Sequence, residues 1–160
     1  MSHRSSVVPL LAVDAFVAVA SGAAAQAPAG MTGTWKLNAA KSTFKPGPAP
    51  KSMTVTYSAA AADGMSIAVE MTPAEGAAQR WDMTAAYDGK EYPIKGNPNA
   101  DSASFKRIDD HTVETTFKKN GKVTAVNIRK LSADGKTLTI TSKGTTVDGK
   151  PRHDVQVFER

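Results

Sequence analysis

Short strand-like runs separated by turn signals such as Asn-Gly and Asp-Gly recur along this chain. Residues 111–143 read HTVETTFKK-NG-KVTAVNIRKLS-ADG-KTLTITSK. Asn-Gly and Asp-Gly supply the positive φ angles that tight hairpin turns need, and Thr, Val and Ile are the residues that strands favour. The stretch therefore predicts an antiparallel meander of three strands.

The register of this meander follows from its turns. A two-residue turn at Asn120-Gly121 predicts one apolar face shared by the first two strands, made of Val113, Thr115, Phe117, Thr124, Val126 and Ile128. A three-residue turn at 133–135 then adds Ile140 to this face, whereas a two-residue turn there would put Arg129 opposite Ile140. We favour the three-residue turn because it keeps one face apolar across all three strands.

The rest of the chain shows the same alternation of apolar and polar residues, and a period of two excludes amphipathic helices. Asp88-Gly89 predicts a hairpin that places Met83 opposite Ile94, residues 38–42 predict one helical turn capped by Asn38, and the Pro-rich residues 45–51 predict an extended connector. About ten short strands follow one another. We predict an all-β fold, an antiparallel up-and-down meander closed into a barrel, with no long helix apart from the signal segment.

The first 25 residues have the layout of a signal peptide. Arg4 gives a positive start, residues 7–20 are apolar but interrupted by Asp14, and Ala23 and Ala25 fit a small-x-small cleavage site before Gln26. An uncleaved Ala-rich tail is the alternative. We predict a signal peptide at 1–25, a linker at 26–31 and a barrel domain at 32–160, exported to the periplasm or secreted, with no transmembrane span in the mature chain.

Composition and motifs limit the classes of function that we expect for this chain. The formal net charge is +5, but the lysines sit singly at predicted turns and only 6% of residues are aromatic, so we expect no nucleic-acid binding. His111 and His153 fall at turns or strand ends, and no catalytic motif appears. We expect a monomer that is not an enzyme and that uses no metal and no cofactor.

The run Gly33-Thr34-Trp35-Lys36-Leu37, followed by Asp-Gly hairpins as far as residue 160, resembles the calycin superfamily of lipocalins and fatty-acid-binding proteins. It looks most like the small exported bacterial proteins of lipocalin-like type. The resemblance implies that Trp35 packs near the barrel floor under a basic residue from the chain end, either Arg160 or Arg152. Two departures are clear. Residues 156–158 replace the Arg-x-Tyr clamp that holds a fatty-acid carboxylate, and the Pro-rich connector replaces the helical lid.

The apolar face predicts a binding pocket for a small hydrophobic or amphiphilic molecule. Its predicted lining is Met53, Val55, Tyr57, Met65, Ile67, Val69, Trp81, Met83, Tyr87, Arg107, Val113, Thr115, Phe117, Val126, Ile128 and Ile140. Arg107 points inward if residues 109–111 form a three-residue turn and outward if the turn has two residues. A buried guanidinium needs an anionic partner, and a ligand carboxylate would serve. The alternative is a structural or protein-interaction barrel whose interior is filled by side chains.

Overall fold

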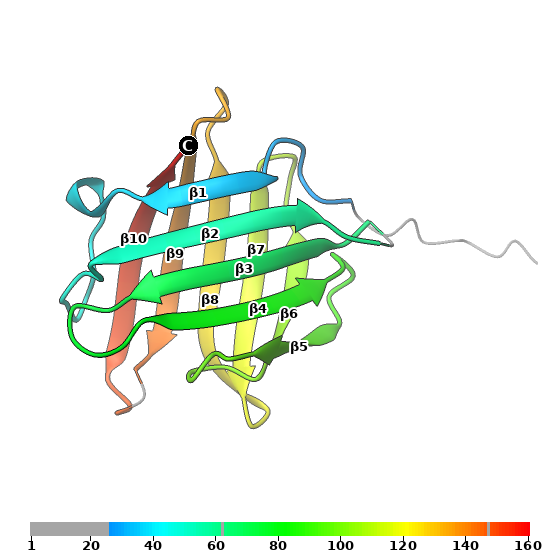
Figure 1. Ribbon diagram of the computed structural model, residues 1–160. Coiled ribbons are helices and arrows are strands. Elements are labelled where there is room, and N and C mark those ends of the chain that lie inside the picture. The colour runs from blue at the N-terminus through cyan, green and yellow to red at the C-terminus, as the bar shows by residue number, and fades with distance from the viewer. Residues whose placement is uncertain (1–25, 62, 147) are drawn as a thin grey trace, which may run out of the picture.

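The computed structural model describes residues 26–61, 63–146 and 148–160, and these form a closed barrel of ten antiparallel strands (Figure 1). The strands are β1 (Gly33–Leu37), β2 (Ser52–Ala59), β3 (Met65–Thr72), β4 (Gln79–Ala85), β5 (Glu91–Lys95), β6 (Ser102–Arg107), β7 (Thr112–Lys119), β8 (Lys122–Leu131), β9 (Thr137–Thr145) and β10 (Pro151–Glu159). Each strand pairs with the next, and β10 closes onto β1. The predicted all-β barrel is confirmed. The predicted signal segment lies outside the described residues.

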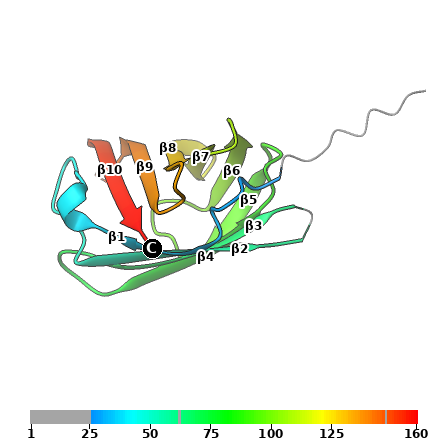
Figure 2. The same ribbon diagram turned by 90° about the horizontal axis from the view of Figure 1, so that it is seen from above.

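The barrel is flattened into two layers, with β1 to β4 on one side and β6 to β10 on the other (Figure 2). The strand pairings at the two sides of the barrel are short: β1 and β10 share two residue pairs, and β4 and β5 share two. One of the β4–β5 pairs is the predicted pair Met83–Ile94. The remaining edge of β10 is covered by the chain after the helical turn η1 (Ala39–Lys41), where Thr43 pairs with Val155. Asn38 caps η1, as predicted.

The register between β7 and β8 differs from the prediction. Lys119 pairs with Lys122 as expected, but a β-bulge then makes Thr124 an extra residue, so Phe117 pairs with Ala125 and Val113 with Arg129. A bulge of this kind turns every later side chain to the opposite face. The predicted inward positions of Val126 and Ile128 are therefore wrong. They face outward, and Ile128 is 37% exposed.

The bulge in β8 also determines which residues of β8 pair with β9. Leu131 pairs with Leu138 and Arg129 with Ile140, which is the alignment of the two-residue turn that we did not favour. Arg129 is thereby placed inside the barrel with 4% of its surface exposed. Gly144 sits opposite Ala125 beside the bulge, where an added Cβ would run into the carbonyl oxygen of Thr124. A glycine at 144 thus lets the bulged strand approach β9.

One end of the barrel is closed by the segment that precedes β1, which the sequence predicts as a linker. Pro28 and Met31 are fully buried there, and Met31 accepts a hydrogen bond from the indole N–H of Trp35 at 2.9 Å. The guanidinium of Arg160 lies 4.5 Å from the centre of the Trp35 ring and donates to the Thr32 carbonyl oxygen. Arg160, rather than Arg152, is thus the basic residue that covers this tryptophan.

The exposed turns carry carboxylates whose pKa values are lowered by hydrogen bonds. In the turn before β10, the Thr146 hydroxyl is the main cause that lowers the pKa of Asp148 to about 2, and backbone N–H groups lower the pKa of Asp88 and Asp109. A carboxyl with a depressed folded-state pKa stabilises the fold above its unfolded pKa, about 4, and this contribution is lost as the pH falls through the folded value.

We therefore expect the melting temperature of the wild-type protein to fall between about pH 4 and pH 2. Thermal unfolding followed by circular dichroism at pH 5 to 2 measures this fall. Asp148→Asn should flatten the low-pH part of the curve, while Asp63→Asn, in another exposed turn, serves as the control. A curve for Asp148→Asn that overlays the wild type would contradict the role of this turn.

Candidate functional site

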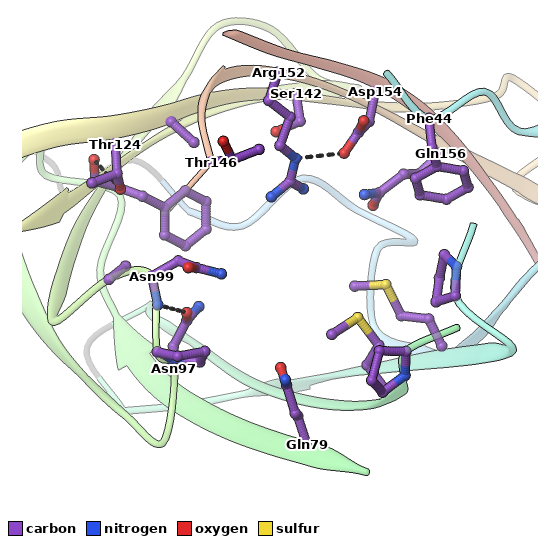
Figure 3. A pocket seen from close by; sticks show the side chains of 18 of the residues that line it. Phe44, Gln79, Asn97, Asn99, Thr124, Ser142, Thr146, Arg152, Asp154 and Gln156 are labelled. Atoms are coloured by element: carbon purple, nitrogen blue, oxygen red, sulfur yellow. Dashed lines mark hydrogen bonds and ion pairs between the residues drawn. The ribbon is translucent and has the colours of Figure 1, made fainter. Parts of the chain in front are cut away.

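A cavity of about 550 Å³ opens at the end of the barrel opposite the closing segment (Figure 3). Its rim comes from the Pro-rich connector after η1 and from the loops that join β3 to β4, β5 to β6 and β9 to β10. This volume lies within the range of about 300–1,000 Å³ that is usual for small-molecule sites. The half of the barrel nearer the closed end is filled by side chains, so the interior is hollow on one side only.

One wall of the cavity is polar and comes from β8, β9 and β10. Asn127 pairs with Ser142 and Ser142 with Asp154, while Gln156 lies two residues further along β10 on the same face; Ser142 and Gln156 are buried. Nearer the rim, the Arg152 side chain projects into the cavity and its Nε donates to Oδ2 of Asp154 at 2.6 Å (Figure 3). The negative charge of Asp154 is therefore balanced by the positive charge of Arg152.

Asp154 also anchors the Pro-rich connector. Its Oδ1 accepts a hydrogen bond from the backbone N–H of Lys45, and the Lys45 carbonyl oxygen accepts one from the N–H of His153. Phe44, which precedes Lys45, lines the cavity on this side (Figure 3). One carboxylate thus holds both the rim arginine and the segment that stands in place of a helical lid.

The facing wall is mainly apolar. Met53 and Met71 pair across β2 and β3, and the ring of Trp81 on β4 is perpendicular to that of Phe117, with the ring centres 6.2 Å apart. Methionine side chains adapt to irregular shapes, and aromatic rings offer large rigid contact surfaces. Gln79, Asn97 and Asn99 lie at this side of the opening (Figure 3). The cavity therefore has the two-sided polarity that an amphiphilic molecule matches.

Beneath the polar wall lies a buried arginine. Arg129 is two residues beyond Asn127 on the same face of β8, and its Nη2 donates to Oγ1 of Thr115 at 2.8 Å. Its guanidinium carbon lies 4.9 Å from the ring centre of Tyr57 and 5.3 Å from that of Phe105. Nη1 of Arg129 and the hydroxyl of Tyr87 are buried without a hydrogen-bond partner.

The predicted lining residues divide into four groups. Three line the cavity: Met53, Trp81 and Phe117. Ten face inward but pack in the filled half or around the cavity wall: Val55, Tyr57, Met65, Ile67, Val69, Met83, Tyr87, Val113, Thr115 and Ile140. Val126 and Ile128 face outward. Arg107 pairs with Val113 as the three-residue turn predicts, but its guanidinium lies at the closed end, bonded to Asp110 and to the Gln26 carbonyl oxygen.

Sequence reasoning missed the polar wall. A register counted from Asn120-Gly121 runs across the bulge, and it places Asn127 and Arg129 on the face opposite to Val126 and Ile128, which is the outer face in that alignment. Counting back from the Leu131–Leu138 pair would have placed both inside. Arg152 and Asp154 carried a weaker signal, since charged residues two apart on a strand share a face.

Comparisons with known proteins agree with this fold. A scan against protein-family models found no match, and a search of curated proteins found none. Among solved structures, the chain is similar to the crystal structure of the wild-type fluorescent protein UnaG, with a TM-score of 0.53 and 18% sequence identity, over 81% of this chain and 96% of that chain. The chain therefore shares the β-barrel fold of that structure.

Among residues 26–61, 63–146 and 148–160, no group of three His, Cys, Asp or Glu side chains is arranged to hold a metal ion. The same residues contain no helix with the length and hydrophobicity of a membrane span.

Proposed function

We propose that this protein binds a small amphiphilic molecule in the cavity at the open end of the barrel. The observation that carries the proposal is the opposition of two walls, with Met53, Met71 and Trp81 on one side and Asn127 and Gln156 on the other. An apolar body would bury its surface against the first wall, at about 25 cal/mol per Å², while its polar end hydrogen-bonds the second. The calycin-type fold is compatible with this role.

The competing interpretation, a structural or interaction barrel with a filled interior, predicts no central cavity. The filled half of the barrel agrees with it, but the hollow half does not.

We also propose that the chain is exported and that the mature protein is a monomer. A cut before Gln26 would keep Pro28 and Met31, which close the barrel. Intact-mass analysis of protein secreted from a bacterial host tests that cut, and a mature mass starting elsewhere would refute it.

Ligand binding is expected to change the fluorescence of Trp81, which lines the cavity, but not that of Trp35, which is fully buried at the closed end. Titration of the purified protein with alkyl alcohols, acids and amines of one chain length measures the change. Trp81→Phe should lose the signal while calorimetry still detects binding. If none of these probes binds and native mass spectrometry of protein soaked in lipid extract retains nothing, the proposal fails.

Filling the cavity is expected to block the same ligands. Met71→Trp places a large ring on the apolar wall and should weaken binding roughly tenfold or more, since overpacking costs on the order of 1–3 kcal/mol. Val126→Trp is the matched control, because the side chain of Val126 is on the outer face of the barrel. Isothermal titration calorimetry compares the two variants. Equal affinity of both variants would place the ligand elsewhere.

A further inference from the structure

The buried arginine beneath the cavity lacks a negative partner. Arginine keeps its positive charge in proteins, and a charge removed from water is costly unless it is paired. Across the described residues, no carboxylate lies within ion-pair distance of Arg129, and its strand partners Val113 and Ile140 are apolar. The nearest acid on the polar wall, Asp154, is already paired with Arg152.

Neighbouring tyrosines do not supply the missing charge. Burial raises the pKa of Tyr57 and of Tyr87, and the Arg129 guanidinium only partly offsets this rise. Both phenols therefore remain neutral near pH 7. The rings of Tyr57 and Phe105 contribute a cation–π attraction to Arg129, which lowers the cost of the buried charge but leaves Nη1 without an acceptor.

Two of the buried polar side chains that have an unpaired group pack on the same ring, because the Arg129 guanidinium lies 5.3 Å and the Tyr87 ring 5.7 Å from the centre of Phe105. Nη1 of Arg129 and the hydroxyl of Tyr87 are donors, and the Asn127 carboxamide, one layer higher on the same strand face, has a buried oxygen without a partner. A half-turn of that carboxamide would present its N–H₂ group instead, so that it too could donate. Donors that gather around a positive charge in a dry site favour an anion.

We propose that Arg129 and Tyr87 form a binding site for one negatively charged group, which enters from the cavity between Asn127, Ser142 and Gln156. The group is either the acidic head of the amphiphile in the cavity or a small inorganic anion such as chloride. The first source rests on the proposed function, and the second does not. The site lies on β8 and beside β4, away from the stretch of β10 that lacks the Arg-x-Tyr clamp.

The test compares wild-type protein with Arg129→Met, which removes the charge at similar length and is expected to fold, because replacing a buried charge by an apolar residue is often tolerated. Decanoate and decanol are titrated by calorimetry. Decanoate should bind the variant roughly 10- to 100-fold more weakly, while decanol binds both proteins alike. Arg107→Met, whose arginine is paired at the closed end, should behave as wild type.

The second arm replaces gluconate by chloride at constant ionic strength and follows the melting temperature. A saturable rise in the wild type that is absent in Arg129→Met supports the inorganic source. If Arg129→Met does not fold, Tyr87→Phe replaces it and should weaken the anion about fivefold. The site is refuted if decanoate and chloride each act equally on wild type and variant. If neither decanoate nor decanol binds, the proposed function fails, and the chloride arm alone decides the anion site.

Discussion

Deletion of Thr141 is expected to prevent folding, whereas deletion of Thr124 should leave the barrel intact. Thr141 lies in a regular stretch of β9 that pairs without interruption with Ile128 on one side and Val155 on the other. Removing one residue there reverses the faces of everything on one side of the deletion. Either Lys143 enters the position of the buried Ser142, or Ile140 leaves the core.

Thr124 differs because it is the extra residue of the bulge. Without it, Val123 would still oppose Lys118 and Ala125 would still oppose Phe117, so the strand faces are kept. We expect a loss of about 1 kcal/mol for this deletion and a loss greater than the whole stability of a small domain, roughly 5 kcal/mol or more, for deletion of Thr141. Urea unfolding monitored by circular dichroism separates the two. A folded Thr141 deletion would contradict the register of β9.

Trp35→Ala is expected to destabilise the protein by roughly 3–5 kcal/mol, as removal of a large fully buried side chain does. Trp35 is 0% exposed, its N–H is bonded to the Met31 carbonyl oxygen, and Arg160 stacks on its ring. The substitution would leave a void and free the closing segment. The free energy of unfolding from chemical denaturation gives the magnitude.

Trp81→Ala is the matched control for this change. Trp81 is only partly buried and borders the existing cavity, so its removal enlarges a space that is already open. We expect a smaller loss of about 1–2 kcal/mol. Equal losses for the two tryptophans would mean that the closed end contributes no more to stability than the open end.

The strand pattern, the hairpin turns and the barrel closure could be predicted because each depends on local residue chemistry. Asp88-Gly89 determines the Met83–Ile94 pair directly, and the covering of Trp35 by a terminal arginine follows from the resemblance. The inward positions of Val113 and Ile140 were also predicted correctly.

The polar interior could not be predicted in the same way. The bulge at Thr124 has no signature in its own residues, and the glycine that accommodates it, Gly144, is 20 positions away on the neighbouring strand. Because Thr124 is an extra residue in β8, Asn127 and Arg129 face the interior of the barrel in place of Val126 and Ile128. The barrel does contain a buried guanidinium, but it belongs to Arg129 and not to Arg107.

Closure of one end by the segment around Met31 has a practical consequence. Gln26 and Arg160 both lie at that end, since Gln26 is bonded by Arg107 and Arg160 reaches Thr32. A tether attached through either residue would hold the barrel by its base and leave its opening facing the surrounding medium. Surface-immobilised sensors and fusion partners can therefore be joined at these positions without obstructing diffusion into the interior.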